Sequence, residues 1–388
     1  MTIALKGTWS FPTKIQFGAG RIRELPKTLN GVRVERPLIV TDSGLRDLPA
    51  FTGMEEMLRE AGVEATVFSD VKGNPIGKNV YDGVAAYREN ACDGVIAVGG
   101  GSGLDAGKVI ALMAGQDCPI WDFDETPGAW KKADAGKIPP IIAIPTTAGT
   151  GSEVGCAGVI VNEETKVKVI IFHPRMLPAT VIADPELTVG LPAKVTAATG
   201  MDALTHCIEA YSVPIFHPMA DGIALNGMHL IERALPVACR DGADIEARSK
   251  MLAAASMGAV AFQKGLGGVH AIAHAVGGLY DTHHGLTNAV LLPYVMAFNR
   301  DAIADKIPLM AQTLNLPRHD FTGVLDWVLG FREHLGIPAR LADIGVDTDQ
   351  ADAVGETASK DSCARGNPRP VSAADLRGLF VDAVEGRL

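Results

Sequence analysis

The sequence predicts an α/β domain with a parallel, Rossmann-like sheet, followed by an all-helical domain. The chain has 388 residues, more than the roughly 250–300 at which a single hydrophobic core stops growing. Up to about residue 185, short β-branched apolar runs alternate with amphipathic stretches, which is typical of βαβ units. Past Leu191, apolar residues recur at helical spacing. We place the boundary near residue 186, which gives domains 1–186 and 187–388.

The expected elements of the first domain follow one another regularly. In chain order, strands are predicted within 36–44, 64–71, 94–103, 138–153 and 178–187, and amphipathic helices within 53–62 and 79–93. The strand runs are almost continuously apolar, as they are in parallel sheets that helices cover on both faces. The segment LPAKVTAATGMDALTHCIEAYSV (191–213) opens the helical half. We expect the chemistry in the cleft between the two domains.

Composition limits the classes of partner. The chain is 47% hydrophobic and 21% charged with a net charge of -10, so it is globular and acidic, and we expect no nucleic acid and no anionic membrane as partner. Small molecules and further copies of the chain are the expected partners. The six cysteines show no C-x-x-C spacing and are expected to be reduced. No signal-peptide pattern or membrane-length apolar run is found, which favours a cytoplasmic location.

Two pairs of candidate metal ligands stand four residues apart. They are Asp202 and His206 in GMDALTHCIEAY, and His270 and His274 in VHAIAHAV. Residues at i and i+4 lie on one face of a helix, so each pair aims two donors at a common point. His284 follows beside a glycine, where a loop brings it back. One carboxylate and three imidazoles, from Asp202, His206, His270 and His284, suit divalent Fe, Zn, Co or Ni with room for a substrate oxygen.

A structural role is the alternative for these histidines. A single histidine on an apolar helix face is more often a packed or capping residue than a ligand, so spacing alone leaves both interpretations open. His274 and His283 exceed the ligand set. We interpret one of them as a candidate proton carrier and the other as a surface residue or a neighbour of the ligands.

A glycine cluster in GVIAVGGGSGLDAGKVIAL separates a buried strand from a helix. This order directs backbone N–H groups at a phosphate. The segment is not a P-loop, which would need Gly at Ser102 and Ser or Thr at Val109. Residues 101–106 fit the dinucleotide fingerprint G-x-G-x-x-A, although at least two strands precede them. A tight turn with Ser102 and Asp105 as a capping box is the alternative that needs no ligand.

Two further segments offer polar groups to a ligand. IPTTAGTGSEV carries hydroxyl groups on Thr146, Thr147, Thr150 and Ser152, and its alternative interpretation is a turn that closes a strand. Asp42, in LIVTDSGL, ends a buried strand, where a carboxylate accepts hydrogen bonds from a ribose diol and repels a 2′-phosphate. Its alternative role is a helix N-cap.

These motifs together resemble the iron-containing (group III) alcohol dehydrogenase family, which is similar in fold to glycerol dehydrogenases and dehydroquinate synthases. The resemblance covers essentially the whole chain. It rests on FPTKIQFGAG, TDSGL, GGGSGLDAGK, IPTTAGTGSEV, DPELT, GMDALTHCIEAY, GVHAIAHAVGG, HGLTNAVLLP and NPRP.

The resemblance implies an NAD-linked, Fe(2+)-dependent alcohol dehydrogenase or aldehyde reductase that forms a homodimer or larger homo-oligomer, and Zn(2+) suits the same ligands. It assigns the metal to Asp202, His206, His270 and His284. His284 then also takes part in catalysis, with His274 as a helper in proton transfer. Residues implied to contact the cofactor are Asp42, Asn74, Gly100, Gly101, Ser102, Asp105, Thr146, Thr147, Thr150 and Lys168.

The sequence departs from the family pattern at one position and leaves the substrate open. Many members have proline after the serine of GGGSG, where this chain has Gly103. Phe262 matches a position that lines the substrate pocket. Maleylacetate reductase or hydroxy-acid dehydrogenase activity is the alternative, with Arg365 and Arg369 as candidate anion contacts. A lyase of the dehydroquinate-synthase type is disfavoured, because the ligand segments are nearly free of Lys and Arg.

Overall fold

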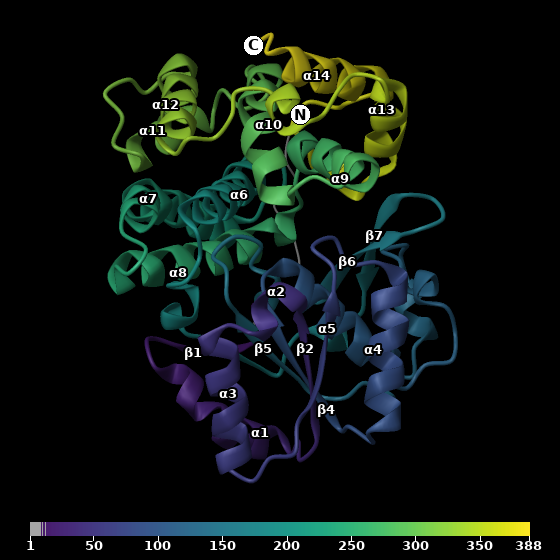
Figure 1. The fold of residues 1–388 in the computed structure, drawn as a ribbon. Coiled ribbons are helices and arrows are strands. Elements are labelled where there is room, and N and C mark those ends of the chain that lie inside the picture. The colour runs from purple at the N-terminus through teal and green to yellow at the C-terminus, as the bar shows by residue number, and fades with distance from the viewer. Residues whose placement is uncertain (1–8, 10, 12) are drawn as a thin grey trace. The chain divides into compact units, whose positions relative to one another are not determined.

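The structure, a computed structural model, describes residues 9, 11 and 13–388, which form two compact units (Figure 1). The α/β unit comprises 13–147 and 151–190. The helical unit comprises 148–150 and 191–388 together with Trp9 and Phe11. The predicted fold class, a parallel Rossmann-like sheet domain and an all-helical domain, is confirmed.

The α/β unit is organised by a six-stranded sheet in the order β1-β8-β5-β4-β2-β3, in which every pair is parallel. Its strands are β1 (Lys14–Phe17), β2 (Pro37–Asp42), β3 (Thr66–Val71), β4 (Gly94–Gly99), β5 (Ile141–Pro145) and β8 (Thr180–Ala183). Its helices are α1 (Leu25–Val32), α2 (Ser43–Arg46), α3 (Pro49–Glu60), α4 (Gly77–Glu89) and α5 (Gly101–Met113). An antiparallel hairpin of β6 (Ala157–Asn162) and β7 (Val167–Phe172) completes the unit.

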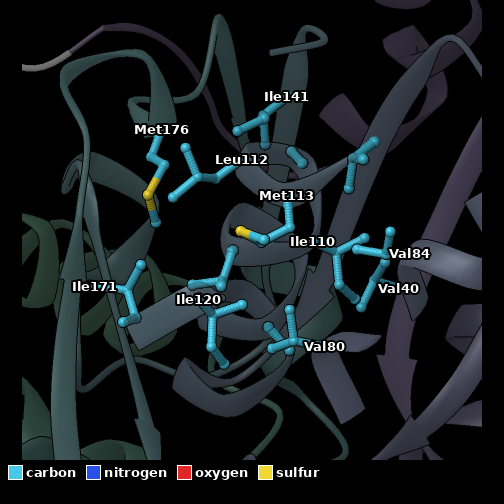
Figure 2. Close-up of a cluster of buried hydrophobic side chains, with 14 of the residues drawn as sticks. Val40, Val80, Val84, Ile110, Leu112, Met113, Ile120, Ile141, Ile171 and Met176 are labelled. Atoms are coloured by element: carbon cyan, nitrogen blue, oxygen red, sulfur yellow. The ribbon is translucent and has the colours of Figure 1, made fainter. Parts of the chain in front are cut away.

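Side chains of the central strands alternate between two hydrophobic clusters, as the two-residue period of a strand requires. In β2, Leu38 and Val40 join the cluster formed with α4 and α5, and Figure 2 shows part of it. Ile39 points to the opposite face, where α1 and α3 pack. Helices therefore cover both faces, and the carboxyl ends of the strands remain the place where polar loops gather.

The helical unit contains nine α-helices among the residues that the structure describes. They are α6 (Ala193–Ser212), α7 (Pro218–Arg240), α8 (Ile245–Ala261), α9 (Gly268–Tyr280), α10 (His284–Phe298), α11 (Ile307–Thr313), α12 (Phe321–His334), α13 (Ala351–Lys360) and α14 (Ala373–Glu385). Helix α6 is buried from Thr196 to its end, which makes it the central helix of the unit. None of the helices in the described part of the chain is long and apolar enough to cross a membrane.

Close packing against α6 depends on small residues of its neighbours. A Cβ added at Gly258 of α8 would lie 3.1 Å from the Cβ of His206, and one at Gly285 of α10 would lie 2.7 Å from the carbonyl oxygen of Ala198. Distances this short leave no room for a side chain. Helix α8 and the ligand-bearing helix α10 therefore approach α6 through glycine.

The sequence interpretation missed β1 and the β6–β7 hairpin. Strand β1 has four residues, only two of which are apolar, and it becomes a strand by pairing with β8 in register Lys14↔Thr180. The hairpin is distant from its contacts in sequence, since Val161 donates a backbone hydrogen bond to the Pro75 oxygen. Strand β1 depends on long-range pairing that local periodicity does not encode. The hairpin strands pair locally, with Asn162 opposite Val167, and their β-branched runs were a signal that the sequence interpretation overlooked.

Candidate metal centre and cofactor site

Helices α6, α9 and α10 bring the four candidate ligands to one point of the helical unit. The Oδ1 atom of Asp202 lies 3.9 Å from Nε2 of His206, and 3.8 Å from Nε2 of both His270 and His284. Asp202, His206 and His270 are buried, and His284 is partly buried at the first turn of α10. Metal–ligand distances of about 2.0–2.2 Å put tetrahedral ligand atoms roughly 3.3–3.6 Å apart. The ligand atoms of Asp202, His206 and His270 lie within 4.8 Å of one another, and their donor chemistry fits a divalent ion. His284 is placed beside them by its distance from Asp202.

Burial keeps His206 neutral. It lowers the pKa of His206 to about 4, so at neutral pH the ring presents a lone pair. Burial also acts on His270, but the hydrogen bond and charge of Glu209, together with the charge of Asp202, outweigh it and raise the pKa of His270 above its usual value. An imidazole with a raised pKa is a more basic ligand, which strengthens its bond to a cation.

Glu209 orients the His270 ring through a hydrogen bond to Nδ1, the nitrogen that faces away from Asp202. Its Oε2 accepts a hydrogen bond from Nδ1 of His270 at 2.6 Å, and its Oε1 accepts one from the backbone N–H of Val269 at 2.8 Å. The contact directs the second nitrogen of His270, Nε2, at Asp202. The sequence interpretation missed Glu209, although it stands three residues after His206 on the same helix.

His274 lies beside this centre without joining it. Its ring stacks on that of His284, with centroids 5.4 Å apart and planes 17° apart, and its Nδ1 lies 2.8 Å from Oδ2 of Asp361. Burial raises the pKa of Asp361, but the charge of His274 and hydrogen bonds from His274 and Cys363 outweigh it and keep that pKa below its usual value. An ionised Asp361 accepts a hydrogen bond from Nδ1 of His274, which fixes the ring. Asp361 is 87 residues from His274 and no sequence signal pointed to it.

Of three other predicted residues, Phe262 contacts a candidate ligand, whereas His283 and Arg369 are exposed. The Phe262 ring lies 5.1 Å from that of His206 between centroids, where it can border a bound substrate. His283 is exposed and caps α10 by accepting a hydrogen bond from the Leu286 N–H. Arg369 is exposed and its guanidinium stacks on Phe298 at 3.9 Å.

The candidate cofactor residues of the α/β unit gather at the carboxyl ends of β2, β3, β4 and β5. Asp42 ends β2, Asn74 follows β3, the glycine loop follows β4, and Thr146 and Thr147 follow β5. Neighbouring parallel strands bring such ends to one edge of the sheet, where ligands bind in open α/β sheets. Thr150 belongs instead to the segment 148–150, which groups with the helical unit.

Short contacts tie these loops together. The Thr146 N–H donates to the Gly99 oxygen at 2.9 Å, and a Cβ at Gly100 would lie 3.2 Å from Thr147 Cγ2. Gly99 has φ +141°, a conformation that favours glycine. The Ser102 hydroxyl donates to the Gly73 oxygen, next to Asn74.

Asp42 lies between a helix end and the glycine loop. Its Oδ1 caps α2 by accepting from the Leu45 N–H at 3.0 Å. Its Oδ2 faces the glycine loop, since a Cβ at Gly99 would lie 3.6 Å from it. The N-cap role and an orientation towards the glycine loop therefore coexist in one carboxylate.

Asp105 and Lys108 brace the loop that follows β5. Asp105 accepts hydrogen bonds from the Ser152 hydroxyl at 2.5 Å and the Val159 N–H at 2.9 Å, so the alternative capping box with Ser102 is not formed. The buried Lys108 ammonium donates to the carbonyl oxygens of Ser152, at 2.9 Å, and of Ala157. It is thus engaged by the protein, unlike the lysine of a P-loop.

Lys168 reaches this region through the hairpin. It lies in β7 opposite Val161 of β6, and Val161 bonds Pro75, the neighbour of Asn74. The hairpin therefore places Lys168 on a strand pair that is attached to the loop after β3.

Comparisons with known proteins agree with this geometry. The family model described as iron-containing alcohol dehydrogenase matches residues 12–185, and its C-terminal counterpart matches residues 196–384. The chain belongs to the iron-containing alcohol dehydrogenase family. It is an oxidoreductase, and the predicted family, enzyme class and cofactors, NAD and iron, are confirmed.

Relatives of this alcohol dehydrogenase family cover nearly the full chain. The 4-hydroxybutyrate dehydrogenase of Cupriavidus necator is 39% identical over 95% of this chain and 97% of its own. A crystal structure of 1,3-propanediol oxidoreductase, 36% identical, superposes with a TM-score of 0.90 over 97% of this chain and 100% of that one. The sulfoacetaldehyde reductase of Bifidobacterium kashiwanohense, solved with NAD+, is 29% identical with a TM-score of 0.87 and covers 98% and 99% of the two chains.

The contact between Glu209 and His270 predicts that Glu209→Gln weakens metal binding. A glutamine has one carbonyl oxygen for two donors, His270 Nδ1 and the Val269 N–H, and it removes the charge that makes the ring basic. We expect affinity for Zn(2+) to fall about 10–100-fold in a chelator competition titration. Glu246→Gln, at an exposed position of α8, is the control and should bind zinc as the unaltered chain does. Equal affinity in both variants would contradict the role of Glu209.

Proposed function

We propose that this alcohol dehydrogenase transfers hydride between NAD(H) and short primary alcohols or aldehydes that carry a second polar group. The observation that carries the proposal is the convergence of Asp202 with three imidazole nitrogens at 3.8–3.9 Å. Burying an ionised carboxylate among imidazole lone pairs is unfavourable in a packed core unless a positive charge compensates it.

Asp202, His206, His270 and His284 hold the ion in this proposal. Fe(2+) is the family metal, and Zn(2+) suits the same nitrogen and oxygen donors. The ion, when bound, supplies Lewis acidity towards the alcohol or carbonyl oxygen, and NAD supplies the hydride chemistry. The net charge of the four ligands is -1, from Asp202, so they leave a divalent ion with positive charge.

His274 moves the proton in this proposal. The hydrogen bond from its Nδ1 to Asp361 leaves Nε2 to exchange a proton with the substrate oxygen or an intervening water. Its stacking on His284 supports this role, because it places the ring beside a ligand. Phe262 borders the substrate by its contact with His206.

The cofactor lies along the carboxyl edge of the sheet in this proposal. Gly100, Gly101 and Ser102 bind the pyrophosphate at the first turn of α5, where N–H groups and the helix dipole favour anions. Thr146, Thr147, Thr150, Asn74 and Lys168 are further contacts. Asp105 acts indirectly, by holding the loop that carries Ser152.

The substrate class follows from what the relatives are named for. They include dehydrogenases of 4-hydroxybutyrate and 1,3-propanediol and a reductase of sulfoacetaldehyde. Each of these molecules carries a second polar group within three carbons of a terminal alcohol or aldehyde.

Reconstitution tests the function. Protein purified without oxygen and loaded with Fe(2+) or Zn(2+) should oxidise NADH with 3-hydroxypropanal or a similar hydroxyaldehyde faster than with carboxylate-bearing or apolar aldehydes of equal length. His270→Ala should lose both bound metal and turnover, because the ion loses a buried ligand. A His270→Ala protein that keeps metal and activity would overturn the assignment, and inertness towards every aldehyde would overturn the function.

The orientation of Asp42 predicts a preference for NAD over NADP. Asp42→Ser keeps a group able to cap α2 and removes the charge that would repel a 2′-phosphate. We expect kcat/KM with NADPH relative to NADH to rise at least about tenfold, equivalent to roughly 1.4 kcal/mol. Asp47→Ser, in the turn after α2, should leave the ratio unchanged. An unchanged ratio in Asp42→Ser would show that the carboxylate faces no ribose.

We further propose a cytoplasmic homodimer or larger homo-oligomer. Six free cysteines support a reducing compartment. Exposed apolar side chains, among them Ile215 and Met219 of the helical unit, support self-association. Sedimentation velocity should give at least twice the mass of one chain at micromolar concentration. A single monomeric boundary would contradict the proposal.

A further inference from the structure

Asn288 completes a third pair of polar residues spaced by four. Asp202 and His206 form such a pair on α6, His270 and His274 on α9, and Asn288 follows His284 by four residues on α10. Asn288 is fully buried. Its position on the face that carries His284 directs its amide at the ligand set.

The amide nitrogen of Asn288 contacts three ligand atoms at once. Its Nδ2 lies 2.7 Å from Oδ1 of Asp202 and 3.1 Å from Nε2 of both His270 and His284. These are the atoms that converge at 3.8 Å around Asp202. The two hydrogens of the Asn288 amide are thus shared among three acceptor atoms. The proposed ion would bind the same three atoms.

The oxygen of the same amide, Oδ1, bears on which way round the amide group is placed. Oδ1 of Asn288 is buried and accepts no hydrogen bond from the described residues. Leaving a buried acceptor without a partner is unfavourable. Rotating the amide would relieve nothing, since it would turn this oxygen towards a carboxylate and two nitrogen lone pairs. His270 presents a lone pair there because its Nδ1 donates to Glu209.

We propose that Asn288 stands in for the cation in the metal-free protein. Its N–H groups offset the repulsion among the converged acceptors and hold them in place, and they give up these hydrogen bonds when an ion binds. Asn288 is therefore a positioning residue that competes with the metal for the same lone pairs. The inference rests on the proposed metal site.

Comparing metal-free and zinc-loaded protein tests the proposal. The full-length chain and its Asn288→Ala and Asn288→Ser variants are stripped with EDTA, and thermal unfolding is followed with and without one equivalent of Zn(2+). Asn299→Ala is the matched control. Asn299 caps the other end of α10, is buried, and bonds the amide of Asn367 rather than a ligand.

We expect Asn288→Ala to lower the unfolding temperature of the metal-free protein more than that of the zinc-loaded protein. The rise caused by zinc should grow by about 2–4 °C or more. Zinc should bind about tenfold tighter in competition with a chelating dye, since no internal donor is displaced. Asn288→Ser, which keeps one donor, should fall between Ala and the unaltered chain. The rise caused by zinc in Asn299→Ala should match that of the unaltered chain.

The opposite outcomes are equally clear. Equal losses in the two forms of Asn288→Ala would make Asn288 an ordinary core residue, and a larger loss in the zinc-loaded form would make it a support of the bound ion; either overturns the proposal. If Asn288→Ala fails to fold in both forms, Asn288→Ser decides by the same comparison. Failure of the unaltered chain to bind zinc or iron would instead refute the proposed metal site.

Discussion

The burial of Asp202 among three imidazoles is the interaction on which the helical unit depends. An ionised carboxylate at 1% exposure is costly unless opposite charge or hydrogen-bond donors surround it. The neutral imidazole of His206 faces it with Nε2, which adds a lone pair rather than relief. The protein alone supplies an amide donor from Asn288. A bound cation resolves the same conflict more completely, so metal binding and stability of this unit are linked.

The packing of the surrounding helices keeps the candidate ligands close to Asp202. Helix α6 is buried along most of its length, and α8 and α10 approach it through Gly258 and Gly285. Each glycine lies against a turn of α6 near a candidate ligand. A methyl group at Gly258 would crowd the His206 side chain, and one at Gly285 would crowd the Ala198 carbonyl and the Asp202 side chain. Glu209, one turn past His206, then sets the orientation of His270 from α6 itself. Packing and electrostatics thus hold the candidate ligands Asp202, His206 and His270 close together.

Spacing pointed to the candidate donors Asp202 and His206 because both lie on one helix, whereas His270 and His284 come from two other helices. The interval of four residues places Asp202 with His206 whatever the tertiary fold. Glu209, Asn288 and Asp361 act through contacts across 61, 86 and 87 residues, respectively. Nothing local distinguishes Asp361 from the many other acids of the chain. Strand β1 escaped prediction for the same reason, since its partner β8 is far away in sequence.

The cofactor loops follow a different physical logic from the metal centre. There, a buried cation of the protein is already paired, because Lys108 is held by Asp105 and by carbonyl oxygens of the loop after β5. An ammonium so engaged is not available to phosphates, so the proposed pyrophosphate site relies on backbone N–H groups at the first turn of α5 and not on Lys108. Backbone N–H groups bind an anion only where the loop conformation points them at it. Lys108 and Asp105 hold that conformation through their hydrogen bonds to the segment after β5. The lysine that most resembles a phosphate ligand in sequence therefore contributes through the loop it holds.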